Sequence, residues 1–343
     1  MEAEPAPSPA LNVLPERVIG VAASAGGVEA LRRLVAALPE NLDAAICIVL
    51  HIPPTGRSLL APILDRDTNL TVRLAEDGAP LRRGVIYVAP ADHHLLVRND
   101  RIELSRGPKE NGVRPAADPL FRTLARSWGE RAVAVVLSGA LDDGAGGAVA
   151  IAQGGGRVIV QDPEDALVPG MPLAALAVTE PFAVATVDEI GDALQRLPVP
   201  DHTAQEVAVA AEADPPDAIA GPIRPDGPPS AFTCPECSGA LWELREGELV
   251  RYRCRVGHAY SEEAMVEAQA TTVEAALWTA LEVLEERSEL LRRIAARMDR
   301  SPSAERRFRQ GAREADERAA VIRRVLGMGG MDLSRADQEA AAG

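Results

Sequence analysis

The sequence has few of the features that mark several common classes of protein. Aromatic residues make up only 3% of its 343 residues, and Lys109 is its single lysine. Lysine and arginine together number 36 against 51 aspartates and glutamates, which gives a formal net charge of -15. A general nucleic-acid binder needs clustered cations to contact phosphates, so this excess of acid argues against that class.

Long apolar runs and cysteines are also scarce. No uninterrupted apolar stretch approaches the roughly 20 residues of a membrane-spanning helix, so membrane insertion is not expected. Residues 1–16 have neither a basic start nor an apolar segment, which predicts a flexible leader rather than a signal peptide. Four cysteines are too few for a disulfide scaffold in a chain of this size, which favours a reduced, cytoplasmic protein.

Hydrophobic residues make up 47% of the chain, enough for a sizeable, largely aliphatic core. The first half alternates short apolar runs with helical patterns, which predicts a doubly wound α/β domain over 17–198, with a mostly parallel sheet and helices on both faces. The expected strands are 17–23, 44–50, 84–89, 132–138 and 157–161. The expected helices are 28–38, 57–64, 118–128 and 145–153, and a local hairpin is expected within 70–105.

The chain changes character after residue 198. Residues 201–231 contain six prolines, six acidic residues and one arginine, so 199–231 is predicted to be a solvated linker. Two helical patterns in 262–328, separated at Ser301-Pro302-Ser303, predict an antiparallel α-helical hairpin, followed by a flexible tail at 329–343. The expected seam between the helices consists of Val273, Leu277, Ala280, Leu284, Leu291, Ile294, Met298, Phe308, Ala312, Ala315, Ala319, Ile322 and Leu326.

Three strand ends of the predicted sheet carry side chains suited to nucleophilic catalysis. Ser24 lies in a turn that nearly matches the nucleophile-elbow pattern G-x-S-x-G, with Ala22 in place of the first glycine. His51 follows the second strand and is placed to act as a general base, while one of Asp142 and Asp143 could orient it. Each residue also has a plainer reading. The histidine could be structural, the aspartates could cap the next helix, and the turn could bind phosphate.

Four runs of residues within 17–198 resemble the catalytic domain of CheB-type protein-glutamate methylesterases. They are 24–27 (Ser-Ala-Gly-Gly), 51–54 (His-Ile-Pro-Pro), 138–144 (Ser-Gly-Ala-Leu-Asp-Asp-Gly) and 160–172, which begins Val-Gln-Asp-Pro-Glu-Asp. The last run is the most specific, and the resemblance covers essentially the whole predicted domain. The chain order serine, histidine, aspartate also differs from that of α/β-hydrolases, in which the acid precedes the histidine.

The resemblance implies a catalytic triad with Ser24 as nucleophile, His51 as base and Asp143 as the orienting acid. It also implies that the backbone N–H groups of Ala25 and Ala140 stabilise the oxyanion. The family commonly has Met-Gly where this chain has Ala-Leu at 140–141. A backbone donor survives that change, but the shape of the pocket becomes an open question.

The activity implied by the resemblance is hydrolysis of glutamate γ-methyl esters on chemoreceptor-like signalling helices, through an acyl-enzyme and without a cofactor. Deamidation of receptor glutamine is a second activity that the family suggests. The family's archetype carries an N-terminal receiver domain, which residues 1–16 cannot form. Control by phosphorylation within this chain is therefore not expected.

A second constellation lies at 232–261. Cys234 and Cys237 form C-x2-C, and after sixteen intervening residues Cys254 and His258 form C-x3-H. Two such knuckles joined by a hairpin predict a Cys3His zinc ribbon, and four protein ligands leave no open position, so the zinc would be structural. The competing readings are four unrelated residues or a disulfide. Cys47, within an apolar strand, is expected to be a core residue.

The ribbon and helical hairpin are interpreted as an accessory module for partner binding or self-association through the C-terminal helices. A rival interpretation of the whole chain is a catalytically weak signalling adaptor, in which the sheet domain and this module bind partners. Labelling of Ser24 by a fluorophosphonate probe would separate an esterase from such an adaptor.

Overall fold

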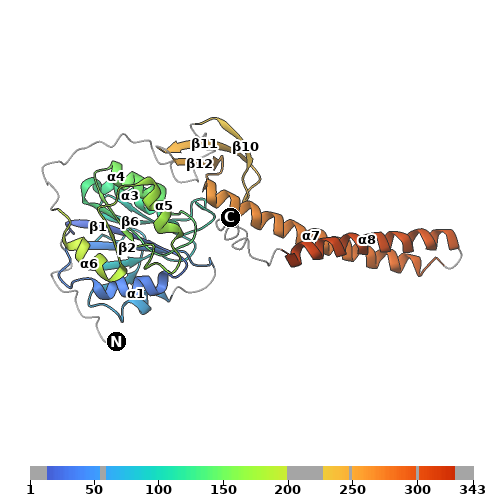
Figure 1. Cartoon of the computed structure of the whole chain (residues 1–343), viewed down its shortest axis with the longest axis horizontal. Helices are drawn as coiled ribbons and strands as arrows, with labels where there is room; N and C mark the ends of the chain where they lie inside the picture. The colour runs from blue at the N-terminus through green and yellow to red at the C-terminus, as the bar shows by residue number, and fades with distance from the viewer. Residues whose placement is uncertain (1–13, 55–58, 199–226, 247–248, 299–300, 329–343) are drawn as a thin grey trace, which may run out of the picture. The chain divides into compact units, whose positions relative to one another are not determined.

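The computed structural model describes residues 14–54, 59–198, 227–246, 249–298 and 301–328 (Figure 1). The chain divides into two compact units, Met1–Met265 and Val266–Gly343. Most of the expected leader and linker, and the whole expected tail, lie outside the described residues. Within the described ranges no helix has both the length and the apolar character needed to cross a membrane.

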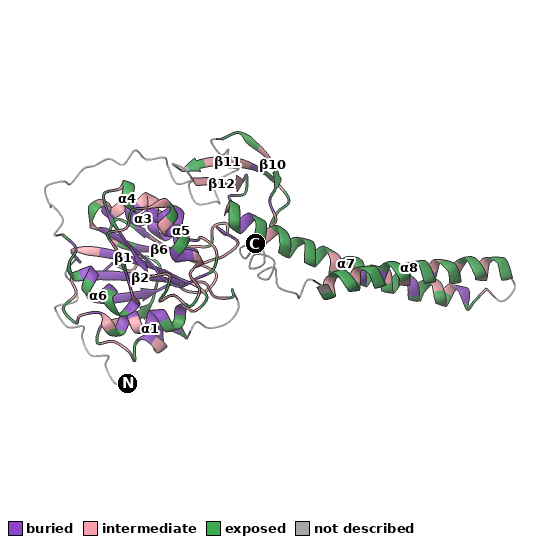
Figure 2. Cartoon of the chain, viewed as in Figure 1, coloured by how far each residue is buried: buried purple, intermediate pink, exposed green. Residues whose placement is uncertain are grey.

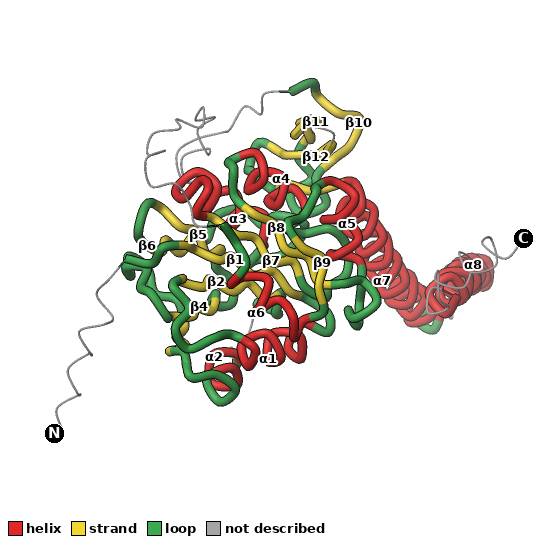
Figure 3. Tube along the Cα trace, turned by 60° about the vertical axis from the view of Figure 1, so that its left-hand side comes forward, coloured by secondary structure: helices red, strands yellow, loops and turns green. Residues whose placement is uncertain are grey.

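A seven-stranded parallel sheet forms the centre of the first unit (Figure 3). Its strand order is β3-β4-β2-β1-β7-β8-β9. The central strands are buried along nearly their whole length, as parallel strands covered on both faces should be. The strands are β1 (Arg17–Ala23), β2 (Ala44–Leu50), β3 (Thr71–Leu74), β4 (Val85–Val88), β7 (Ala132–Val136), β8 (Arg157–Gln161) and β9 (Ala183–Ala185).

Helices cover both faces of this sheet, and each face has its own apolar core (Figure 2). One core includes Phe121 and is covered by α3 (Ala117–Trp128), α4 (Ala145–Gln153) and α5 (Gly170–Val178). The other includes Leu31 and is covered by α1 (Gly27–Ala37), α2 (Leu60–Leu64) and α6 (Val187–Gln195). The predicted doubly wound α/β fold is therefore confirmed.

The strand order places the three candidate catalytic residues after the carboxyl ends of three neighbouring strands. β1 lies between β2 and β7. The strands that follow β1 in the chain, β2 to β4, lie on one side of it, and β7 to β9 lie on the other. Ser24 follows β1, His51 follows β2 and Asp143 follows β7. In sheets of this kind ligands bind outside the carboxyl ends of the strands at the point where the order reverses.

Several elements differ from the sequence expectations. The expected hairpin within 70–105 is present as β5 (His94–Arg98) and β6 (Arg101–Ser105), and a short 3-10 helix spans Gly129–Arg131. The helix expected at 57–64 begins at Leu60, although residues 55–58 are outside the described part. α5, β9 and α6 were not predicted. α5 lacks a polar face, and β9 has only three residues, so neither has a clear periodic pattern.

A small antiparallel sheet of four strands completes the first unit. It has the order β10 (Pro229–Thr233), β11 (Ala240–Glu246), β12 (Leu249–Cys254) and β13 (Ala259–Ser261). We call residues 229–261 the ribbon. The expected hairpin is the β11–β12 pair, whereas β10 begins inside the stretch expected to be linker because it pairs with β11.

The second unit contains an antiparallel pair of helices, α7 (Glu262–Ala295), which begins in the first unit, and α8 (Pro302–Met328). The α8 side of the predicted seam holds, since Ala312, Ala315 and Ala319 are buried. On α7 the prediction was wrong for Val273 and Ala280, which are exposed. The buried α7 positions include Leu281, Ser288 and Ala295. A polar Ser288 fits there because its hydroxyl donates to Asp316 at 2.6 Å and also lies 3.1 Å from the Ala312 carbonyl.

Candidate active site and metal centre

Ser24 lies in a sharp turn between β1 and α1. Its N–H donates to the Ser138 carbonyl at 2.9 Å, which fixes the turn against the loop after β7. Gly26 has a φ of 76°, and a Cβ added there would lie 2.7 Å from the Ser138 hydroxyl. The turn therefore requires glycine both for its backbone angle and for space. Ser24 itself is only partly buried.

His51 is brought beside Ser24 by the pairing of β1 and β2. Its N–H donates to the carbonyl of Ala23 at 3.1 Å, and Ala23 is the residue directly before Ser24. Its Nε2 lies 2.7 Å from Asp143 Oδ2. Within the described residues no hydrogen bond joins the Ser24 hydroxyl to His51. Because Nε2 faces Asp143, Nδ1 is the ring nitrogen left for another partner.

The carboxylate of Asp143 is buried and accepts several hydrogen bonds. Besides His51, the Ala117 N–H donates to Oδ2 at 2.6 Å and the Asn111 amide donates to Oδ1 at 3.0 Å. Burial by itself raises the pKa of Asp143, but the hydrogen bonds from His51, Ala117 and Asn111 outweigh it and leave the pKa below its ordinary value. An ionised, firmly held carboxylate can orient an imidazole and stabilise its charged form.

The neighbouring Asp142 has a different environment. Its carboxylate accepts a hydrogen bond from the Ser261 hydroxyl at 2.7 Å. Of the two aspartates that the sequence left as candidates for orienting the histidine, only Asp143 contacts His51 in the described structure.

Asn111 is a site residue that the sequence reasoning missed. It occupies a two-residue turn with Gly112, in which both residues have positive φ, 52° and 75°. Glu110 and Val113 exchange two backbone hydrogen bonds across that turn, as in a type I′ hairpin. Asn-Gly is a strong signal for such a turn. The signal predicts the local backbone but not the contact with Asp143, 32 residues away.

Asp118, a buried acid, is a second residue that the sequence reasoning missed. Its Oδ1 accepts hydrogen bonds from the N–H groups of Gly144 at 3.1 Å and Gly147 at 2.7 Å, which fixes the start of α4 directly after Asp143. Burial raises the pKa of Asp118 to about 6; Arg251 opposes this shift, and Asp143 adds to it. The position looked like an ordinary acidic residue in a first helical turn, so no signal marked it.

The two backbone groups expected to stabilise an oxyanion belong to loops that are tied together. Ala25 and Ala140 are both exposed, and neither N–H donates to another described residue. The Ser138 hydroxyl donates to the Ala25 carbonyl at 2.8 Å and accepts from the Val168 N–H at 3.0 Å. Val168 belongs to the 160–172 run, so that motif braces the loop after β7. Leu141 there has a φ of 59°, a backbone angle that favours glycine.

A cavity of about 290 Å³ opens beside His51. It is the size of a small-ligand site and can admit an extended side chain. Its walls combine the His51–Pro54 segment with residues from the Asn111 turn region and two cations, Lys109 and Arg114. Arg114 is paired with Asp92, whose carboxylate also contacts Arg106.

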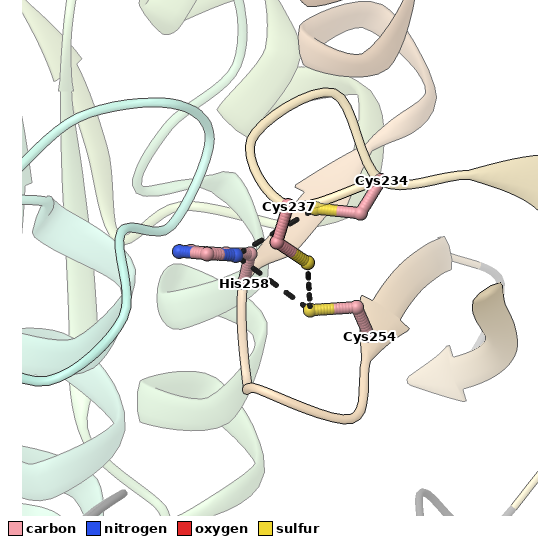
Figure 4. A group of neighbouring side chains, drawn as sticks. All are labelled: Cys234, Cys237, Cys254 and His258. Atoms are coloured by element: carbon pink, nitrogen blue, oxygen red, sulfur yellow. Dashed lines mark hydrogen bonds between the residues drawn. The ribbon is translucent and has the colours of Figure 1, made fainter. Parts of the chain in front are cut away.

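The four predicted metal ligands come together in the ribbon (Figure 4). Their ligand atoms all lie within 4.8 Å of one another. Cys237 Sγ and Cys254 Sγ are 3.7 Å apart, and His258 Nδ1 lies 3.6 Å from both Cys234 Sγ and Cys254 Sγ. A tetrahedral zinc site has edges of about 3.8 Å between sulfurs, so this group could bind a metal. Cys47 is fully buried in β2, as expected.

Comparisons with known proteins agree with this arrangement. The family model described as CheB methylesterase matches residues 19–194. A protein-glutamate methylesterase/protein-glutamine glutaminase of Caulobacter vibrioides is 43% identical over 182 residues, which cover 52% of this chain and 52% of that protein. One from Pyrococcus abyssi is 39% identical over 188 residues, covering 53% of this chain and 51% of that protein. The chain thus spans about half the length of the curated relatives it matches.

Among solved structures, the CheB methylesterase catalytic domain of Thermotoga maritima is similar to the sheet domain. The TM-score is 0.50 with 34% sequence identity, and the match covers 52% of this chain and 96% of that one. The ribbon lies beyond the residues that the family model matches. The model nevertheless covers more than half of the chain, and the resemblance predicted from the four sequence runs is confirmed: the chain belongs to the CheB methylesterase family.

Proposed function

We propose that the chain is a serine hydrolase that removes methyl groups from glutamate γ-methyl esters on chemoreceptor-like signalling proteins. The observation that carries the proposal is the 2.7 Å contact between His51 Nε2 and Asp143 Oδ2 beside the Ser24 turn. The printed names of the relatives, protein-glutamate methylesterase/protein-glutamine glutaminase, support the substrate class. They also make deamidation of receptor glutamine a second activity to test.

In the proposed reaction, the Ser24 hydroxyl oxygen attacks the ester carbonyl while His51 takes its proton. Since Nε2 is held by Asp143, Nδ1 is the nitrogen that accepts this proton. The N–H groups of Ala25 and Ala140 stabilise the oxyanion, and their lack of other described acceptors supports that role. Methanol leaves with the proton from His51. A water then attacks the acyl-enzyme while His51 takes its proton, and His51 returns that proton to the departing Ser24 oxygen, which leaves a glutamate side chain on the receptor.

The substrate side of the proposal rests on the cavity beside His51. A methylated glutamate side chain is uncharged and extended, and a space of about 290 Å³ is larger than it requires. This proposal concerns the sheet domain; the partners of the rest of the chain are a separate question.

The test is methanol release from methylated receptor helices by the full chain, together with labelling by a fluorophosphonate probe. Wild-type protein is expected to release methanol and to be labelled at Ser24. Ser24→Ala is expected to lose both activities while keeping the wild-type circular dichroism spectrum. Ser230→Ala in β10, at a partly buried serine outside the sheet domain, serves as a serine control. A wild-type chain that resists labelling would favour the adaptor interpretation over the esterase.

For the ribbon we propose a structural zinc held by Cys234, Cys237, Cys254 and His258. Four protein ligands support a structural role because they leave no open coordination position. Metal analysis of purified protein tests this: about one zinc per chain is expected, and none in Cys254→Ala. The domain boundaries, the cytoplasmic localisation and self-association through the C-terminal helices stay predictions.

A further inference from the structure

The ribbon contributes a buried arginine to the region behind the triad. Arg251 on β12 has a side chain only 5% exposed, although most arginines keep their guanidinium in water. It lies 2.9 Å from Glu110 Oε2 and 3.2 Å from Asp118 Oδ2. Both acids belong to the sheet domain: Glu110 directly precedes the Asn111 turn, and Asp118 lies in the first turn of α3.

Asp118 links Arg251 to the loop that carries Asp143. Its other oxygen, Oδ1, accepts the N–H groups of Gly144 and Gly147 at the start of α4. Gly144 is the residue directly after Asp143. The positive charge of Arg251 therefore holds in place a buried carboxylate that anchors the backbone next to Asp143.

A second contact runs from β13 of the ribbon to Asn111. The Asn111 N–H donates to the Ala259 carbonyl at 2.8 Å, and the Ser261 N–H donates to Asn111 Oδ1 at 3.0 Å. An amide whose oxygen is occupied in this way must turn its NH2 group the other way. That group donates to Asp143 Oδ1 at 3.0 Å. The ribbon backbone thus determines which end of the Asn111 amide faces the triad acid.

We propose that the ribbon is a built-in part of the esterase that positions Asp143, with Arg251 and Asn111 as its positioning residues. The inference rests on the proposed function of the Ser24–His51–Asp143 group. Two chains of contacts carry it, one through Asp118 and one through the Asn111 amide, and they meet where that amide also donates to Asp118. The ribbon then acts on the reaction through the orientation of Asp143 and His51.

The charge balance supports a role beyond joining two parts of the chain. Asp118 and Asp143 are buried carboxylates hydrogen-bonded to the same Asn111 amide. Two such acids repel each other unless a cation lies close by. Arg251 is the cation 3.2 Å from Asp118, and it comes from a segment outside the family match. Loss of this charge is expected to disturb the acid pair first, because Glu110 keeps its contacts with Arg122 and Arg253.

The test compares Arg251→Met, Arg251→Lys and Asn111→Gly with wild type. Glycine suits residue 111 because of its positive φ, so only the side chain is lost. Arg245→Met is the matched control, since Arg245 lies on neighbouring β11 with its side chain 74% exposed. We measure kcat and KM for methanol release, the rate of fluorophosphonate labelling at Ser24, the zinc content and the melting temperature of each variant.

We expect Arg251→Met and Asn111→Gly to lower both kcat and the labelling rate by about 10- to 100-fold, because small displacements of catalytic groups cost that much. KM and zinc content should stay near wild type, Arg251→Lys should recover part of the rate, and Arg245→Met should match wild type. A purely structural role would instead lower the melting temperature while the folded fraction kept the wild-type kcat.

The outcomes separate this inference from the proposed function. Wild-type rates in Asn111→Gly, or in folded Arg251→Met, overturn the positioning role while the esterase stands. If Arg251→Met fails to fold, Asn111→Gly and Arg251→Lys decide the question. A wild-type chain that is labelled but releases no methanol overturns the substrate assignment, and the labelling rates still test the positioning. A wild-type chain that is not labelled overturns both.

Discussion

The sheet domain and the ribbon are stabilised in different ways. The sheet domain has an apolar core on each face of its sheet, with Phe121 and Leu31 fully buried within them. The ribbon buries few apolar side chains, chiefly Leu241, Tyr252 and Tyr260, alongside two of its cysteines. A segment of this size buries too little surface to fold alone, and the proposed zinc would supply the missing folding free energy.

The same contrast extends to the candidate sites. The candidate active site is assembled from strand ends that the large cores already hold, so we expect that its residues can be replaced without unfolding the domain. The proposed metal ligands include two of the few buried side chains of the ribbon, Cys234 and Cys254. Changes at the triad should therefore affect activity, and changes at the Cys3His group should affect folding. The buried junction through Arg251 is where one region influences the other.

Metal removal should have the largest effect, because it should unfold the ribbon while the sheet domain stays folded. Binding of a structural zinc is worth about 10–16 kcal/mol of apparent folding free energy in small metal-dependent domains. Chelation, or Cys254→Ser, should expose the β11–β12 amides to rapid hydrogen exchange while the strands of the large sheet stay protected. Cys47→Ala, in the sheet core, should keep its zinc. Protected ribbon amides in metal-free protein would contradict the metal dependence.

Asp143→Asn should have the next largest effect, and on activity alone. A neutral amide can no longer hold His51 in the required tautomer, which is expected to lower kcat by about 10⁴-fold. The melting temperature and the zinc content should stay near those of wild type. Asp142→Asn is the matched control, because the Asp142 carboxylate contacts Ser261 and not His51. Equal losses in the two variants would argue against Asp143 as the triad acid.

A truncation in the core of the sheet domain should lower its stability, whereas Asp143→Asn should lower only its activity. Phe121→Ala removes a fully buried ring and should lower the free energy of unfolding by about 3–5 kcal/mol, measured by urea denaturation. Phe182→Ala, at a position 42% exposed, should cost much less. Zinc content should be unchanged in both variants at temperatures where they are folded. Loss of zinc from folded Phe121→Ala would show that the two regions fold as one.

The smallest effect concerns acid sensitivity. Hydrogen bonds from Arg114 and Arg106 lower the pKa of Asp92 to about 2. A lowered pKa means that Asp92 stabilises the folded state above pH ~4, and that this contribution is lost as the pH falls toward 2. Because Asp92 is partly exposed, screening should limit the contribution to about 1 kcal/mol or less. Asp92→Asn should therefore flatten the acid side of the stability profile slightly. An unchanged profile would show that the pair contributes nothing.

Acid should act on the ribbon by a different route. Cysteine and histidine ligands bind a metal only when deprotonated, so protons compete with the metal. The β11–β12 amides should lose protection at a pH where the strands of the large sheet are still protected. Hydrogen exchange measured along one pH series can follow both regions in the same sample.

Much of the sheet domain could be predicted because its signals are local. The strand bounds of β1, β2 and β8 and the bounds of α4 match the expectations, since apolar runs bounded by glycine and charged residues determine them. The errors lie where local pattern and packing disagree. Ala280 has the right spacing for the helical seam but is exposed, whereas Ser288 is polar yet buried because Asp316 accepts its hydrogen bond.

The sequence by itself determined the residue types and spacings: Ser24, His51 and Asp143 at three strand ends, and a Cys3His pattern of two knuckles separated by sixteen residues. Only the tertiary structure decided that Asn111 and Asp118 contact Asp143 and that Arg251 contacts Asp118. Arg251 and Asp118 lie 133 residues apart in the chain, and no periodicity links them. Contacts between buried charges at such separations depend on how whole elements pack, and packing is a property of the folded chain.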